Sequence, residues 1–98
     1  MQNFITVDFS FREKLYGSVL LVKHTIDCTI YQITIMNGEL EKILSGNRRI
    51  YEINGCLQIE ACESKEQETL KQKIAEALGK LLRKPFKKIN ELPAKRIE

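Results

Sequence analysis

The hydrophobic pattern of this chain changes its period once, and that change constrains the fold more than any other feature. In the first half, Ile5, Val7 and Phe9 alternate with polar residues, a period of two that is typical of a half-buried strand. In the second half, apolar residues recur at the spacing of one helix face. They are Leu70, Ile74, Ala77, Leu78, Leu81 and Leu82. An antiparallel sheet followed by a helix, an α+β fold, is therefore expected.

Three strands are expected before the first Asn-Gly dipeptide. The first alternates from Ile5 to Phe11, and the second runs near Ser18–His24 with apolar residues on both faces. Residues 13–17 break the pattern between them. The third, near Thr29–Met36, is rich in the β-branched and aromatic residues that favour strands.

The dipeptide Asn-Gly occurs twice, at residues 37–38 and at residues 54–55. Asn and Gly best tolerate the positive φ that both positions of a type I′ hairpin turn need. Two such turns predict two further hairpins, and hence an antiparallel meander of five or six strands over residues 3–62.

The pairing register follows from these two turns. The first places Ile35 opposite Leu40, and the second places Glu52 opposite Leu57. A five-residue loop between the hairpins then sets Lys42 opposite Glu52. Three interpretations of that pair stay open: two solvated side chains at the end of the sheet, which is favoured, a partly buried ion pair, or a functional acid–base pair.

One long C-terminal helix over residues 64–84 is expected to pack on one face of the sheet. The hydroxyl of Ser64 can cap its start, and Gln67 completes a capping box. Pro85 ends it, because the residue before a proline is pushed out of the helical region. Gly79, inside the pattern, is expected to permit a close approach to the sheet.

Residues 1–84 are expected to form a single domain, followed by a basic segment over residues 85–98. In that segment Phe86, Ile89 and Leu92 recur every three residues. The segment is predicted to be either a short second helix or a loose tail. Its apolar stripe is a candidate protein-interaction site.

Charge is distributed unevenly along the 98 residues, whose net charge is +3. Residues 1–70 hold 7 Lys/Arg and 10 Asp/Glu, a net of −3, whereas residues 71–98 hold 9 and 3, a net of +6. A basic end can neutralise phosphates, which makes it a candidate anion or nucleic-acid contact. Its candidate residues are Lys80, Arg83, Lys84, Lys87 and Lys88. Only Phe86 is interleaved among them, so no base-stacking platform is predicted.

No catalytic, metal-binding or cofactor motif is visible, so an enzyme is not expected and no cofactor is predicted. The cysteines Cys28, Cys56 and Cys62 are odd in number and lack Cys-x-x-Cys spacing, and His24 is the only histidine. The longest apolar run, Val19–Val22, is far too short to span a membrane. A cytoplasmic protein is the resulting expectation.

The expected architecture looks incomplete. Six strands about 4.8 Å apart make a sheet roughly 24 Å wide, whereas a helix is only about 10–12 Å across. Several apolar residues fall on the far face of the sheet: Leu20, Val22, Ile30, Met36, Ile43, Tyr51 and Ile53. The sheet can curl into a partly closed barrel, the C-terminal segment can wrap across it, or a second copy can cover it.

The third solution is favoured, because a symmetric dimer is the commonest way to cover an apolar face. The sequence therefore predicts a small non-enzymatic domain that self-associates as a homodimer or binds a protein partner. The alternative is a nucleic-acid-binding accessory domain that uses the basic end.

Overall fold

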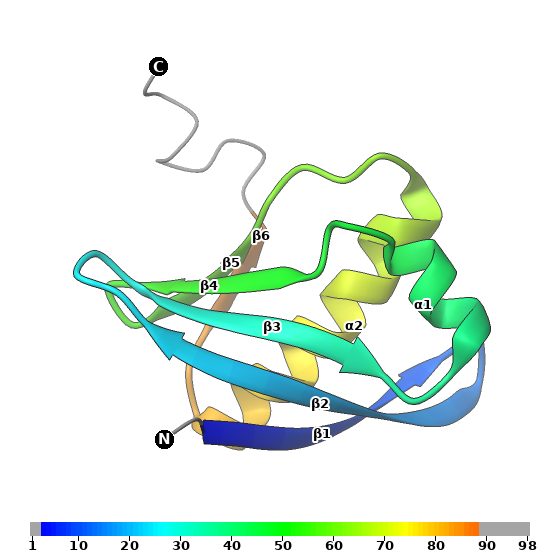
Figure 1. Cartoon of the computed structure of the whole chain (residues 1–98), viewed down its shortest axis with the longest axis horizontal. Helices are drawn as coiled ribbons and strands as arrows, with labels where there is room; N and C mark the ends of the chain where they lie inside the picture. The colour runs from blue at the N-terminus through cyan, green and yellow to red at the C-terminus, as the bar shows by residue number, and fades with distance from the viewer. Residues whose placement is uncertain (1–2, 89–98) are drawn as a thin grey trace.

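The computed structural model describes residues 3–88, which fold into one sheet and two helices. The elements are β1 (Asn3–Phe11), β2 (Lys14–His24), β3 (Thr29–Ile35), α1 (Gly38–Leu44), β4 (Arg49–Ile53), β5 (Cys56–Ile59), α2 (Lys65–Leu82) and β6 (Phe86–Lys88). The strand order is β1-β2-β3-β4-β5-β6 (Figure 1). All pairs are antiparallel except β5 and β6, which run parallel. The expected α+β fold, a mostly antiparallel sheet with a C-terminal helix, is confirmed.

The sheet curls around α2 instead of lying flat beneath it. The helix packs against β1 at one end of the strand order and against β5 and β6 at the other. Figure 1 shows α2 on the concave side of the curved sheet, with α1 closing one end. The curl brings the two ends of the sheet to α2, which packs mainly against β1, β5 and β6, as the comparison of sheet and helix widths expected, while α1 packs against β3. Of the three solutions above, curling is the one that encloses the core.

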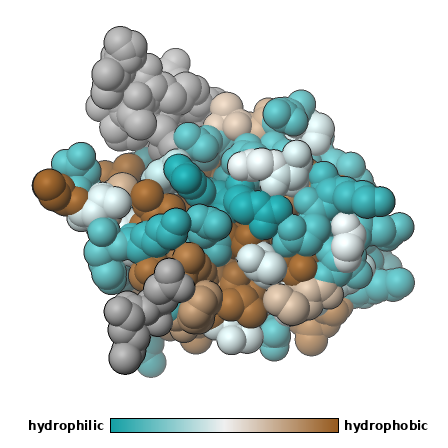
Figure 2. All heavy atoms as spheres, viewed as in Figure 1, coloured by the Kyte–Doolittle hydropathy of each residue, from teal (hydrophilic) through white to brown (hydrophobic). Residues whose placement is uncertain are grey.

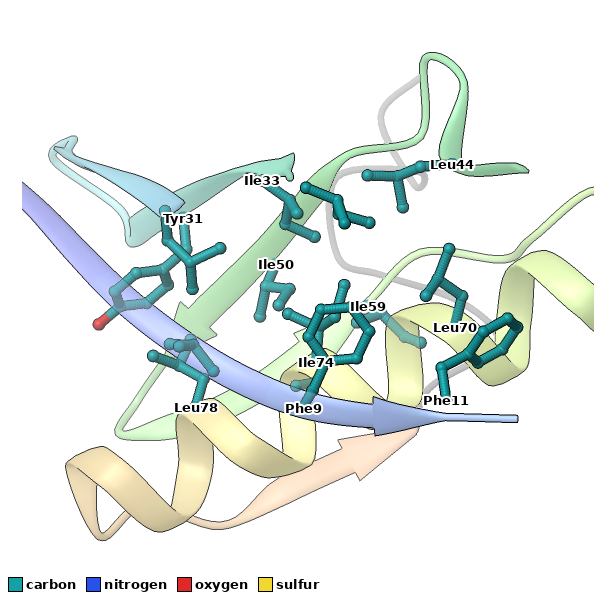
Figure 3. Close-up of a cluster of buried hydrophobic side chains, with 14 of the residues drawn as sticks. Phe9, Phe11, Tyr31, Ile33, Leu44, Ile50, Ile59, Leu70, Ile74 and Leu78 are labelled. Atoms are coloured by element: carbon teal, nitrogen blue, oxygen red, sulfur yellow. The ribbon is translucent and has the colours of Figure 1, made fainter. Parts of the chain in front are cut away.

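The core collects side chains from β1 to β5 and from both helices (Figure 3). Leu20 and Val22 belong to this side of the sheet, which corrects their expected place on the far face. Leu20 pairs with Ile5 on β1 and is fully buried, while Val22 pairs with Tyr31 and packs against the core. Their registers follow from the β1–β2 turn, whose position the sequence did not reveal.

That turn is formed by Arg12 and Glu13, with φ of 53° and 66°. Because neither residue is a glycine or asparagine, the usual hairpin signal is missing, and β2 begins at Lys14 rather than near residue 18. Arg12 is held by an ion pair with Glu66 at the start of α2, and its guanidinium lies 4.9 Å from the centre of the Phe11 ring. These tertiary contacts support two backbone conformations that side chains rarely adopt.

The predicted hairpin at Asn37-Gly38 was wrong, because this dipeptide starts helix α1. Asn37 has an extended φ of −162°, and its side-chain oxygen accepts the N–H of Leu40 at 3.0 Å. Asn is as good an N-cap as it is a turn residue. Leu40 and Leu44, one helical turn apart, are both buried against the core.

With α1 in place, the predicted pairs Ile35–Leu40 and Lys42–Glu52 do not form. Glu41 instead ties the helix to β3, because its carboxylate accepts the N–H of Ile35 at 2.6 Å. The same carboxylate forms an ion pair with Arg48 at 2.6 Å. The pair holds α1 against the chain that leads into β4.

The second Asn-Gly dipeptide forms the hairpin that the sequence predicted. Asn54 and Gly55 have φ of 55° and 77°, and they join β4 to β5. Glu52 lies opposite Leu57, as expected. The same dipeptide therefore starts a helix at one site and turns a hairpin at the other, which sequence-local reasoning does not separate.

Helix α2 begins as predicted, with the Ser64 hydroxyl accepting the N–H of Gln67 at 3.1 Å. It ends at Leu82, two residues earlier than expected, where Arg83 takes a left-handed conformation with φ of 59°. Most of the predicted stripe faces the core, but Leu81 is 56% exposed. A Cβ at Gly79 would make only an ordinary contact with Leu57 on β5, at 3.6 Å, so the close approach that needs a glycine is to the Lys84 carbonyl and not to the sheet.

The chain after α2 returns to the sheet. Phe86–Lys88 form the strand β6, with Phe86 beside Leu57, whereas a helix or tail was expected. The strand forms because the edge of β5 was still open to pairing, a condition that only the assembled sheet creates. Ile89 and Leu92 lie outside the described residues.

Candidate interaction surfaces

The convex side of the sheet carries an apolar stripe along β2 and its neighbours. Side chains of one strand alternate between faces, so Leu15, Val19 and Leu21 point away from the core that Leu20 enters. Phe4 is the cross-strand partner of Leu21 and shares this face. The outer patch, as we call it, comprises Phe4, Leu15, Val19, Leu21, Ile30 and Met36.

Three members of the outer patch are strongly exposed: Phe4 at 60%, Leu15 at 72% and Met36 at 61%. Figure 2 shows hydrophobic side chains gathered over β1 and β2, with hydrophilic side chains over much of the remaining surface in this view. A contiguous apolar group of this kind marks an interaction site more often than single exposed residues do.

The expected far-face residues beyond the patch have mixed positions. Tyr51 and Ile53 lie on the convex side of β4, where both are half-buried. Ile43 lies on α1 and packs against the core, which corrects its predicted place on the sheet. Beside Tyr51, Gln58 is only 8% exposed, and its side-chain oxygen has no hydrogen-bond partner among the described residues.

Part of the predicted basic end gathers in a groove where α2 meets β6. Lys80, Arg83, Lys84 and Phe86 line this groove together with the acidic Glu76, and its volume is about 410 Å³. Lys87 does not join them, because it pairs with Gln58 and faces the convex side of the sheet. Lys88 is the last residue of β6. Two of the five predicted residues, Lys80 and Arg83, thus line the groove without an ion pair among the described residues.

Lys84 is engaged by Glu52, which replaces the pair expected with Lys42. The carboxylate of Glu52 accepts the Lys84 ammonium on one oxygen and the Tyr31 hydroxyl, at 2.6 Å, on the other. Burial acts to raise the pKa of Glu52, but the hydrogen bonds from Lys84 and Tyr31 outweigh burial and hold it below 4.5. Burial and the Glu52 carboxylate raise the pKa of Tyr31. The cluster joins β3, β4 and the chain after α2.

A second polar cluster joins the two helices. The Lys71 ammonium, on a fully buried side chain, donates to Asn47 Oδ1 at 2.6 Å. Asn47 in turn donates to Gln67 Oε1 at 3.0 Å, and Gln67 Nε2 donates to the carbonyls of Ile43 and Leu44 at 3.0 and 3.1 Å. Burial lowers the pKa of Lys71 to about 8, against a smaller opposing effect of nearby Cys62 and Glu60. The cluster satisfies the last carbonyls of α1 and anchors the first turns of α2.

The remaining titratable groups within residues 3–88 form no reactive constellation. His24 Nδ1 lies 3.2 Å from the Thr29 hydroxyl, near the end of the β2–β3 hairpin. Cys28, Cys56 and Cys62 are half-buried and form no disulfide among residues 3–88. In the same part of the chain, no group of three His, Cys, Asp or Glu side chains could hold a metal ion. No helix found there has the length and apolar character needed to cross a membrane.

Sequence reasoning missed both polar clusters. Gln67 and Lys71 follow Ser64 at helical spacing, and with Leu70 and Ile74 they lie on the buried side of α2. Their helical spacing could therefore have indicated that they are buried, although polar residues on a helix are ordinarily assigned to its solvent-exposed face. The Glu52–Lys84 pair joins residues 32 positions apart, and no local pattern announces it.

The fold and these surfaces were compared with known proteins. No protein-family model matches the chain, and no curated protein or solved structure shows significant similarity to it.

Proposed function

We propose that this protein is a small non-enzymatic interaction domain that self-associates through the outer patch. The observation that carries the proposal is the exposed apolar stripe centred on Leu21 and its partner Phe4. Two copies that pack their convex faces together would bury the stripe much as two sheets do in a sandwich. A two-fold contact needs only one self-complementary patch, and it closes without further growth.

Two further observations support this assignment. The apolar core is complete within one copy, with Leu20 and Ile33 both fully buried, so the patch is a surplus of apolar surface rather than an unfilled half of the core. The polar clusters around Glu52 and Lys71 are internally paired and join elements of the fold. We place the protein in the cytoplasm, in line with three cysteines that form no disulfide among the described residues.

Solution mass tests the proposal. Light scattering on wild type at tens of micromolar is expected to give about twice the mass of the 11.4 kDa chain. Leu21→Glu, which places a charge at the centre of the patch, is expected to give the mass of one chain with an unchanged circular dichroism spectrum. Ile26→Glu is the matched control, because Ile26 is fully exposed at the β2–β3 turn, outside the patch. A wild-type mass of 11.4 kDa would rule self-association out.

A second candidate function is nucleic-acid binding by the basic end. The observation in its favour is the groove where Lys80 and Arg83 stand beside Phe86. Electrostatic binding of this kind is expected to weaken steeply between about 50 and 200 mM salt, whereas apolar self-association barely responds. Absence of retention on a phosphate-bearing resin at low salt would exclude this candidate.

The apolar stripe predicted at Phe86, Ile89 and Leu92 stays a prediction. Phe86 is half-buried on β6 and packs against the core, so its ring serves the fold as well as any contact with a partner.

A further inference from the structure

The free edge of β1 and the exposed side of α2 form a groove that shares only Glu76 and Lys80 with the candidate nucleic-acid site and only Leu15 with the outer patch. β1 lies at one end of the strand order, so one of its edges pairs with no described strand. Two hollows follow this edge. One, of about 420 Å³, lies between residues 6–8 of β1 and Ala77, Lys80 and Leu81 of α2. The other, of about 340 Å³, lies between residues 8–10 of β1 with Leu15 of β2 and an overlapping stretch of α2, formed by Lys73, Glu76, Ala77 and Lys80.

Backbone hydrogen bonds show which groups of β1 face this groove. The N–H of Met36 donates to the carbonyl of Gly17 at 3.0 Å, so the backbone N–H and C=O groups of Gly17 point toward the β3 side of β2. Bonding alternates along an antiparallel ladder, so the next residue, Ser18, turns its backbone groups toward its β1 partner Val7. The alternate residues of β1 therefore turn their N–H and C=O groups to the free edge. They are Phe4, Thr6, Asp8 and Ser10.

This edge lacks most of the features that prevent an exposed strand from pairing with a strand of another molecule. β1 is nine residues long and contains neither proline nor glycine, and Asp8 is its single charge. Natural proteins protect exposed edges with short strands, lysine, proline or bulges. Among residues 3–88, no backbone hydrogen bond joins this edge to α2. No strand within the described part of the chain pairs with this edge.

The spacing of the two hollows matches an extended chain. Moving from one hollow to the next advances two residues along β1, and alternate side chains of a strand are roughly 6.6–6.8 Å apart. The small side chain of Ala77 lines both hollows and leaves room between helix and strand. A segment paired to β1 would thus place successive inward side chains in successive hollows.

We propose that this groove binds an extended segment of a partner protein, which adds as a strand to β1 with period-two side chains entering the two hollows. A second copy is a poorer occupant, because its β1 carries its own α2 along the same edge. Two-fold pairing of the two β1 strands would bring both helices to one seam. The groove lies at the sheet edge, and Leu15, which lines the second hollow, is the one residue that it shares with the outer patch.

A nonapeptide display library, matched in length to β1, is the probe. Selection on the full-length wild-type protein is expected to enrich peptides with alternating apolar residues. On binding, amide exchange is expected to slow at Thr6 and Asp8, whose N–H groups face the groove, with little change at Val7, which already pairs with β2. A synthetic copy of the best peptide then serves for affinity measurements.

Two variants locate the site. Thr6→Pro removes one groove-facing N–H and no bond of the β1–β2 ladder, a position where edge strands tolerate proline. Ala77→Arg fills both hollows from the helix side, and because Ala77 is partly buried against the core, its circular dichroism spectrum is compared with that of wild type. Each is expected to weaken peptide binding at least about tenfold. Thr6→Pro would do so by removing a buried hydrogen bond to the peptide, and Ala77→Arg by blocking the hollows. Leu21→Glu, the outer-patch variant, is expected to bind peptide as wild type does.

Equal binding by wild type and Ala77→Arg overturns the proposal, and this result stands even if Thr6→Pro disturbs the fold. Failure of the library to yield any binder overturns it too, as do selected peptides without alternation. Loss of peptide binding in Leu21→Glu alone would move the peptide site to the outer patch. Monomeric wild type that still binds peptide would refute self-association and leave the groove intact.

Discussion

Gly79 and Lys84 are in contact across the turn that ends α2. The N–H of Lys84 donates to the Gly79 carbonyl at 2.9 Å, and a Cβ built on Gly79 would stand 2.7 Å from the Lys84 carbonyl oxygen. Only glycine, which has no Cβ, fits at this position without displacing the Lys84 carbonyl. Helix propensity alone favours alanine by about 1 kcal/mol.

Replacing Gly79 with alanine is expected to lower the free energy of unfolding by about 1–3 kcal/mol, because the obstacle is a backbone atom that cannot turn aside. Gly38→Ala is the matched control. Nothing lies within 4 Å of a Cβ at that position in α1, so the free energy of unfolding should hold or rise by up to about 1 kcal/mol. Urea denaturation measures both, and equal effects of the two substitutions would contradict the steric account.

The buried Lys71 predicts a rise in stability at alkaline pH. Its pKa is about 8 in the folded protein and 10.5 in a model peptide. Between these values the unfolded chain binds more protons, so the free energy of unfolding increases with pH, by up to about 3 kcal/mol. Below pH 8 Lys71 is charged in both the folded and the unfolded state, so folding bears the full free-energy cost of burying its ammonium group.

Lys71→Met removes this titration while keeping a long side chain. The stability of wild type relative to Lys71→Met is expected to climb from pH 8 to 10.5 and to be flat below pH 8. Lys73→Met is the control, because Lys73 is exposed on the same helix. Denaturant unfolding across this pH range decides the matter, and parallel profiles for wild type and Lys71→Met would refute it.

The Glu52–Lys84 pair predicts a contribution to stability that is lost in acid. Because the pKa of folded Glu52 is lowered from 4.5, the contribution is present above that pH and disappears as pH falls through the folded value. Lys84→Met is expected to raise the pKa of Glu52, since burial then meets less opposition, and to cost about 1 kcal/mol at pH 7.

Carboxyl NMR of Glu52 measures the shift directly. Lys87→Met, at an exposed position on the neighbouring β6, should leave the pKa of Glu52 unchanged. An unaltered Glu52 pKa in Lys84→Met would show that Tyr31 holds the carboxylate without help from the lysine.

Local chemistry was enough to predict several elements. The alternation from Ile5 to Phe11 predicted β1, the Ser64 hydroxyl predicted the start of α2, and Asn54-Gly55 predicted the β4–β5 hairpin with its register. In each case the residues that carry the signal also make the stabilising contact. At Asn37-Gly38 the local sequence allows either a hairpin turn or a helix start. The burial of nearby residues decides between them, and α1 forms because it carries Leu40 and Leu44 into the core.

The candidate surfaces were less accessible to prediction. An uncovered apolar face was expected, and Ile30 and Met36 do lie on it, but Leu20 and Val22 do not. A single turn at Arg12 and Glu13 sets the faces of β2, and its two positive φ values have no sequence signal. Only some of the predicted basic residues come together in the groove, because β6 fixes the path of the chain after α2. The pairing of β6 with β5 requires the rest of the sheet to form first.

The amino-acid sequence by itself determined the α+β class, the single long helix and the alternation that sorts most strand residues between core and solvent. Those properties depend on periods and caps that act over a few residues. The tertiary structure alone decided that the sheet curls around α2, that Glu52 meets Lys84 and that the edge of β1 beside Ala77 pairs with no described strand. Such features join residues far apart in the chain, and only close packing of the assembled core selects among the pairings that local patterns allow.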